Sequence, residues 1–101
     1  MKFRIGIGYG RHRLGPSTAL ILGGVEIPHE KGLIGHSDGD VLSHAITDAL
    51  LGACGLGNIG EMFPDSAEEN RGRDSLEMLR LAVRRVKDTG WAPVQVDVTV
   101  I

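Results

Sequence analysis

Two histidines far apart in the sequence are the first candidates for chemistry. His12 follows a glycine-rich stretch, and His44 lies in a segment with helical periodicity. Neutral imidazoles from separate elements can share a zinc ion, whose third protein ligand is usually a carboxylate or another histidine. Asp40 and Asp48 lie four residues to either side of His44, so on a helix they share its face and could hold its second ring nitrogen. The same pattern also fits ordinary hydrogen-bonded histidines on a solvated acidic face.

The segment from His36 to Asp40, with the sequence HSDGD, is a second candidate because it precedes the same helical pattern. Backbone N–H groups at a helix N-terminus attract anions, and the side chains of His36 and Ser37 could add hydrogen-bond donors. The acidic residues of the segment would repel a bare phosphate unless a metal ion neutralised them. Ser37 and Asp38 are also common helix caps, so a structural role explains the segment as well.

The loop from Asn58 to Asp65 is a third candidate. Its glycine lets backbone groups approach a ligand closely, and Asn58 and Asp65 can hydrogen-bond hydroxyl groups. Spacing alone favours a plain connecting loop. The stretch Gly6–Gly10, in contrast, is no dinucleotide fingerprint, because its third glycine comes one residue too early and no helix pattern follows it.

Two amphipathic helices are predicted to position these residues. The first begins at Ser37 or Asp38, and the second begins at Asp74 with a capping box. Gly55 and Gly90 end them. The first helix has an apolar arc that should face the core, made of Leu42, Ala45, Ile46, Ala49, Leu50 and Ala53. The second has an apolar stripe made of Leu76, Leu79, Ala82, Val83 and Val86.

Short strands are predicted around these helices. Large apolar residues alternate with small or polar ones over Phe3–Gly8 and over Gln95–Ile101, which is typical of half-buried strands. The segment Ala19–Pro28 is predicted to be a hairpin, because the Gly23-Gly24 pair at its centre suits the positive φ angles of a tight hairpin turn.

Length, charge and cysteine content limit the class of protein. The 101 residues are expected to form one domain, residues 1–101. Eleven Lys and Arg against thirteen Asp and Glu give a formal net charge of -2, which excludes a strongly basic nucleic-acid-binding protein. No apolar run approaches the ~20 residues of a membrane span. The single cysteine, Cys54, favours a reducing compartment. We therefore expect a soluble, cytoplasmic protein without nucleic-acid or membrane partners.

The segment Ser37–Ala53, read as SDGDVLSHAITDALLGA, resembles the signature of the 2-C-methyl-D-erythritol 2,4-cyclodiphosphate synthase family. Further family-like segments stand in family order around it: Arg4–Gly6, His12–Arg13, Leu22–Val25, Gly57–Gly60, Phe63–Asp65, Asp74–Ser75 and Val96–Asp97. The resemblance implies a CMP-releasing lyase of non-mevalonate isoprenoid biosynthesis. In that reaction the 2-phosphate of 4-diphosphocytidyl-2-C-methyl-D-erythritol 2-phosphate attacks the β-phosphorus and closes 2-C-methyl-D-erythritol 2,4-cyclodiphosphate. A phosphate is already a nucleophile, so catalysis becomes positioning and charge neutralisation by metal ions.

The resemblance also implies roles for individual residues. His12 and His44 would bind zinc, and His36 would be the catalytic residue that stabilises the transition state. The substrate-binding residues would be His12, His36, Ser37, Asn58, Ile59, Gly60, Phe63, Pro64, Asp65, Ser66 and Ala67. A magnesium or manganese ion would bridge the diphosphate. The implied fold is α+β, a mixed β-sheet with α-helices packed on one face, in a homotrimer whose sites lie between neighbouring subunits.

The sequence departs from the family pattern in three places. Gly10 stands where the family has an aspartate zinc ligand, so one of three protein ligands is missing unless Asp38 or Asp40 replaces it. Asn58 stands where aspartate is frequent, and an amide oxygen can still accept a bond from a hydroxyl. Family members continue beyond the position of Ile101 with residues of the cytosine pocket and of the second metal site. We therefore expect an incomplete domain with little or no activity; the alternative is a non-catalytic relative kept for assembly or ligand binding.

Overall fold

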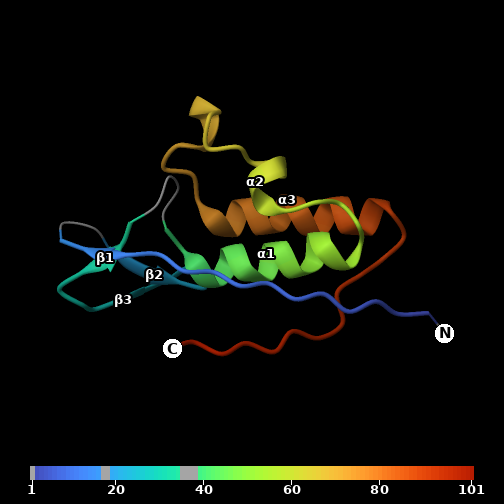
Figure 1. Ribbon diagram of the computed structural model, residues 1–101, viewed down its shortest axis with the longest axis horizontal. Helices are drawn as coiled ribbons and strands as arrows, with labels where there is room; N and C mark the ends of the chain where they lie inside the picture. The colour runs from blue at the N-terminus through green and yellow to red at the C-terminus, as the bar shows by residue number, and fades with distance from the viewer. Residues whose placement is uncertain (1, 17–18, 35–38) are drawn as a thin grey trace.

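The computed structural model describes residues 2–16, 19–34 and 39–101 and has helices and short strands in one α+β arrangement (Figure 1). In chain order the elements are β1 (Leu14–Gly15), β2 (Leu20–Leu22), β3 (Val25–Ile27), β4 (Gly32–Leu33), α1 (Val41–Ala53), α2 (Ile59–Met62), the 3₁₀ helix η1 (Glu68–Asn70) and α3 (Ser75–Asp88). The predicted α+β class is confirmed. None of the helices in the described ranges is long and apolar enough to cross a membrane.

The strands form two separate antiparallel pairs. β2 and β3 make the predicted hairpin, with Leu20 opposite Ile27. Gly23 and Gly24 form its turn with φ angles of 61° and 78°, a left-handed conformation that glycine adopts without steric cost. β1 pairs with β4, with Leu14 opposite Leu33. Within the described residues the sheets are thus antiparallel pairs, in place of the mixed sheet that the family resemblance implied.

The first helix begins later than the sequence predicted. Asp40 is its N-cap and accepts a hydrogen bond from the backbone N–H of Ser43 at 3.1 Å, while Ser37 and Asp38 lie outside the described residues. The second long helix, α3, begins as predicted after Asp74, whose carboxylate accepts from the N–H of Leu76 at 3.0 Å. Asp and Ser are preferred at this position because their oxygens satisfy backbone donors that the first helical turn leaves without partners.

The two long helices pack side by side and form the centre of the structure (Figure 1). The buried side chains of α1 are Ser43, Thr47 and Leu51, and those of α3 are Ser75, Met78, Ala82 and Val86. The prediction that the apolar arc of the first helix forms its buried face is therefore wrong. Small side chains at the contact let the two helix backbones approach closely, and the Thr47 hydroxyl is satisfied by the Ser43 carbonyl at 2.8 Å.

The chain on either side of these elements is extended but unpaired, so the strands predicted over Phe3–Gly8 and Gln95–Ile101 are wrong. A Cβ added at Gly6 would overlap the carbonyl of Ala49, which shows that the N-terminal segment lies directly on α1 through its glycine side. The alternate side chains point away, and Ile7 is 91% exposed. The N-terminal segment does alternate between two faces, as its sequence predicts. Its glycines face α1, however, and its large apolar side chains do not.

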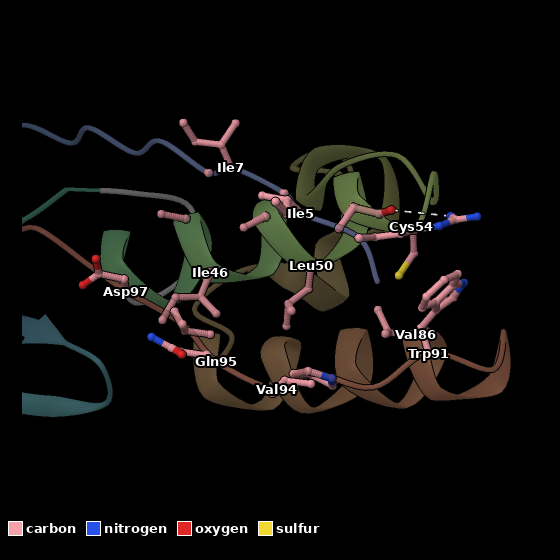
Figure 2. Close-up of a pocket in the computed structure, with 18 of the residues that line it drawn as sticks. Ile5, Ile7, Ile46, Leu50, Cys54, Val86, Trp91, Val94, Gln95 and Asp97 are labelled. Atoms are coloured by element: carbon pink, nitrogen blue, oxygen red, sulfur yellow. Dashed lines mark hydrogen bonds between the residues drawn. The ribbon is translucent and has the colours of Figure 1, made fainter. Parts of the chain in front are cut away.

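An apolar groove of about 750 Å³ separates the N-terminal extended segment from the C-terminal one along α1. Figure 2 shows Ile46 and Leu50 of α1 on its wall, together with Val86 of α3 and Trp91 and Val94 of the chain that follows. The arc that the sequence predicted to be the core face of the first helix therefore lines this groove and is only half-buried.

The neighbouring leucines of α1 test this assignment of faces. Leu51 is fully buried against α3, so we expect Leu51→Ala to lower the free energy of unfolding by about 2–5 kcal/mol. Leu50→Ala removes the same atoms from a half-buried position, so it should lower the free energy of unfolding clearly less than Leu51→Ala does. Urea denaturation of both variants measures the difference, and an equal or reversed order would show that the packed face is misassigned.

Candidate functional site

His12 and His44 lie close together in the structure, although they are 32 residues apart in the sequence. Their ring centroids are 5.6 Å apart and the ring planes meet at 62°. A zinc ion bound to an imidazole at 2.0–2.1 Å lies about 3.2 Å from the ring centre, so two imidazoles on a tetrahedral ion have centroids about 5.2 Å apart. The observed separation therefore fits a shared ion.

The orientation of His12 is fixed by the backbone. Its Nδ1 lies 2.7 Å from the carbonyl oxygen of Ile34, next to β4. A carbonyl can only accept, so Nδ1 carries the proton and donates it, which leaves the lone pair of a neutral ring on Nε2. This is the arrangement found in metal-binding histidines, whose second nitrogen usually donates to a carbonyl or carboxylate.

His44 is held by Ser75, which the sequence indicated only as part of the family-like segment Asp74–Ser75 and without a role. Its Nε2 lies 2.7 Å from the hydroxyl oxygen of Ser75, the first residue of α3. Asp40 or Asp48 was expected to hold the second nitrogen, and the contact found at Nε2 is with Ser75. The family-like segment Asp74–Ser75 is the signal in the sequence that includes this residue, but its contact with His44 exists only where α1 packs on α3.

The two carboxylates near His44 have structural partners instead. Asp40 is fully buried and accepts hydrogen bonds from the backbone N–H groups of Gly23 at 2.9 Å and Gly24 at 2.8 Å, which dock the hairpin turn on the start of α1. It also accepts from the hydroxyl of Ser43 at 2.8 Å. Asp48 accepts from the N–H of Ile59 at 2.7 Å and so fixes the start of α2. Asp40 is therefore committed and does not replace the missing metal ligand.

A third protein ligand is not found in the described part of the chain, where no cluster of three His, Cys, Asp or Glu side chains could hold a metal. At Gly10 a Cβ would clash with the Val41 side chain and lie 3.0 Å from the Val41 carbonyl oxygen. The two histidines thus fit a cation as a pair, and its remaining positions would be filled by water or substrate oxygens.

The histidine pair borders a cavity of about 230 Å³. Its lining consists of His12, His44, Ile59, Gly60, Phe63, Asp65, Asn70 and Met78. Five of the proposed substrate-binding residues are in this set, and Asn70 and Met78 were not predicted. Asn58, Pro64, Ser66 and Ala67 are not in it, while His36 and Ser37 lie outside the described residues.

The loop beside the cavity is held by a polar network around Asn70 that no pattern in the sequence predicted. Asn70, which is 2% exposed, donates from Nδ2 to the carbonyl of Pro64 at 2.8 Å and accepts at Oδ1 from Arg73 at 2.9 Å. The Arg73 guanidinium lies 5.1 Å from the centre of the Phe63 ring and also bonds Glu77 at 2.8 Å. These contacts fix the position of Phe63 on the cavity wall.

Asn58 has a related structural role at the other end of the loop. Its Oδ1 accepts from the N–H of Glu61 at 2.9 Å, which caps the short helix α2. An aspartate oxygen could accept the same backbone bond, but the bond that Asn58 donates from Nδ2 to Oε1 of Glu61 at 3.2 Å requires the amide.

Comparison with known proteins places these features in a family context. A profile of the YgbB family matches residues 3–101. The chain is 62% identical over 98% of its length to the 2-C-methyl-D-erythritol 2,4-cyclodiphosphate synthase of Chromobacterium violaceum, and 57% identical over 100% of its length to that of Dechloromonas aromatica. It covers 63% of each of these relatives and so spans less than two thirds of their length.

Solved protein structures also match this chain. A 2-C-methyl-D-erythritol 2,4-cyclodiphosphate synthase in a CDP-bound form matches with a TM-score of 0.80 and 49% identity, over 86% of this chain and 58% of that chain. The bifunctional IspDF of Campylobacter jejuni matches with a TM-score of 0.78 and 45% identity, over 83% of this chain and 23% of that chain.

Two neighbouring arginines test the network around Asn70. Arg73→Ala removes a bond to a buried amide and a contact with Phe63, so we expect it to lower the free energy of unfolding by about 1–3 kcal/mol and to speed amide hydrogen exchange over residues 63–71. Arg71 makes only an exposed ion pair with Glu68 at 3.6 Å, so Arg71→Ala should change stability by less than about 0.5 kcal/mol. Similar exchange rates in the two variants would contradict the network's role.

Proposed function

Because this chain belongs to the YgbB family, we propose that it serves the cyclodiphosphate synthase reaction of non-mevalonate isoprenoid biosynthesis. The substrate would be 4-diphosphocytidyl-2-C-methyl-D-erythritol 2-phosphate, and the products 2-C-methyl-D-erythritol 2,4-cyclodiphosphate and CMP. The observation that carries the proposal is the approach of His12 and His44 to 5.6 Å beside the cavity, within a sequence 62% identical to a synthase of that name.

The reaction asks for positioning and for neutralisation of charge. An oxygen of the 2-phosphate forms a bond to the β-phosphorus as the bond from that phosphorus to the oxygen of the CMP phosphate breaks, and CMP leaves with the electron pair. The nucleophile is already ionised at neutral pH, so no general base is needed. The rate then depends on holding the two phosphates in line and on offsetting their negative charge.

The residues of the cavity divide these tasks. His12 and His44 would hold a zinc ion, and the cation when bound would supply positive charge next to the phosphate oxygens. Asp65 can accept hydrogen bonds from a hydroxyl of the polyol, and Phe63, which is 6% exposed, gives the cavity an apolar wall. His36 and Ser37, proposed as transition-state and substrate contacts, stand in the segment just before α1.

The remaining parts of the proposal derive from the family resemblance. A magnesium or manganese ion on the diphosphate would supply further positive charge. The full-length protein would be a cytoplasmic homotrimer whose sites lie between neighbouring subunits. A relative of known structure binds CDP, which is consistent with a cytidine-diphosphate-linked substrate. Many large apolar side chains are exposed, among them Val94 at 98%. Their exposure supports contacts with other subunits or with further parts of the protein.

A second candidate function is supported by Gly10. Without a third protein ligand among the described residues, the histidine pair would bind zinc weakly, as in a non-catalytic relative kept for assembly or for binding a phosphorylated ligand. Zinc binding and CMP release, measured on the same protein, separate the two functions.

Zinc binding is tested with three histidines. His12→Ala and His44→Ala should each weaken zinc binding at least about tenfold, because each removes one of two protein ligands. His29 is an exposed histidine whose ring bonds the Lys31 backbone, so His29→Ala is the matched control and should leave affinity unchanged. Competition with a chromophoric chelator gives the dissociation constants, and equal affinities in all four proteins would exclude the site.

Restoring an aspartate at position 10 tests the hypothesis that the site is catalytic. We expect Gly10→Asp to raise zinc affinity and CMP release only when Val41 is also shortened, because the Val41 side chain occupies the space that a Cβ at position 10 needs. The double variant Gly10→Asp/Val41→Ala should therefore exceed both single variants. If CMP release stays at background while zinc binding rises, the non-catalytic function is favoured; if neither changes, position 10 does not belong to a metal site.

A further inference from the structure

We propose that Ser75 is a positioning residue for His44, and that its hydroxyl holds the imidazole so that Nδ1 is the nitrogen presented to a cation in the cavity. This inference rests on the proposed function, because it concerns how one half of the histidine pair is oriented. It concerns a residue of α3 that has no place in the ligand set inferred from the sequence.

The contact between the two side chains is built by the packing of two helices. The hydroxyl oxygen of Ser75 lies 2.7 Å from Nε2 of His44, and Ser75 is fully buried. Ser75 is the first residue of α3, while Asp74 caps that helix through the N–H of Leu76. The cap of α3 therefore does not depend on the serine hydroxyl, which meets His44 across the contact between the two helices.

The bond selects which nitrogen of His44 faces a metal. With Nε2 committed to Ser75, a cation that binds His44 in this orientation binds it through Nδ1. Binding there needs the lone pair on Nδ1 and the proton on Nε2, and a serine oxygen can accept that proton's hydrogen bond. His12 has the opposite arrangement, because the Ile34 carbonyl holds its Nδ1 proton and leaves Nε2 for the cation.

The choice of a hydroxyl has an electrostatic consequence. A carboxylate bonded to a metal-binding histidine adds a negative charge close to the ion. Of the described carboxylates on the histidine's side of α1, Asp40 bonds the N–H groups of Gly23 and Gly24, and Asp48 bonds that of Ile59. A serine orients the ring without adding charge. This contact by itself therefore leaves the positive charge of the ion available to the phosphate oxygens that the proposed reaction must neutralise.

Metal affinity is the first readout. Ser75→Ala should weaken zinc binding about tenfold or more, the usual effect of losing a hydrogen bond to a metal-binding histidine. Ser75→Thr keeps a hydroxyl and should recover most of the affinity. Ser43→Ala is the matched control, because Ser43 is a buried serine of α1, 1% exposed, that bonds Asp40 and no histidine. It should lower stability but not zinc affinity, and equal zinc affinity in Ser75→Ala and the unaltered protein would overturn the proposal.

The ring nitrogens themselves give the second readout, which does not depend on metal binding. In protein labelled with ¹⁵N-histidine and free of metal, at about pH 9 where imidazoles are neutral, the ¹⁵N shifts of His44 should show the proton on Nε2. Ser75→Ala should give a mixture of both tautomers. A proton on Nδ1 in the unaltered protein would overturn the proposal whatever the metal data show.

Cadmium-113 loaded on the same labelled protein separates this inference from the proposed function. Coupling to Nδ1 of His44 and Nε2 of His12 is expected, and coupling to Nε2 of His44 would refute the role of Ser75. If the protein binds no metal at the pair but His44 still carries its proton on Nε2, the proposed metal site fails while the positioning by Ser75 stands.

Discussion

The close packing of α1 on α3 is the constraint on which the candidate site depends. Small side chains at the contact, among them Ser43, Thr47 and Ala82, let the helices approach, and this brings Ser75 of one helix to His44 of the other. The same contact buries Leu51, which supplies much of the apolar stabilisation. A larger residue at this seam would separate the helices and break the hydrogen bond that orients His44, so stability and site geometry are coupled through one surface.

Asp40 joins this helix pair to the rest of the structure. A buried carboxylate is stable only when hydrogen bonds replace its lost hydration, and Asp40 accepts them from its own helix and from the turn at Gly23 and Gly24. The hairpin is thereby docked at the start of α1. At its other end, Asp48 ties the helix to α2. Asp40 and Asp48 on the acidic face of the helix thus hold neighbouring segments in place, and Nε2 of His44, between them in the sequence, meets the Ser75 hydroxyl.

The local features of the fold were predictable because they depend on neighbouring residues. The Gly23-Gly24 turn, the cap at Asp74 and the end of α3 before Gly90 all follow from φ preferences and from side-chain oxygens near backbone donors. The buried faces of the helices were not predictable in the same way. Leu50 and Leu51 have the same hydrophobicity, and only the position of α3 decides that Leu51 is buried while Leu50 lines the apolar groove (Figure 2).

The sequence by itself determined the family, the two long helices and the identity of His12 and His44 as a candidate pair, since these depend on residue types and their order. Only the tertiary structure decided that the two ring centroids lie 5.6 Å apart, that the Ser75 hydroxyl meets Nε2 of His44, and that Val41 fills the space beside Gly10. The physical reason is that such contacts join residues far apart in the chain. Their distances are set by how the helices and the extended segment pack, and periodicity along one helix carries no information about what lies across from it.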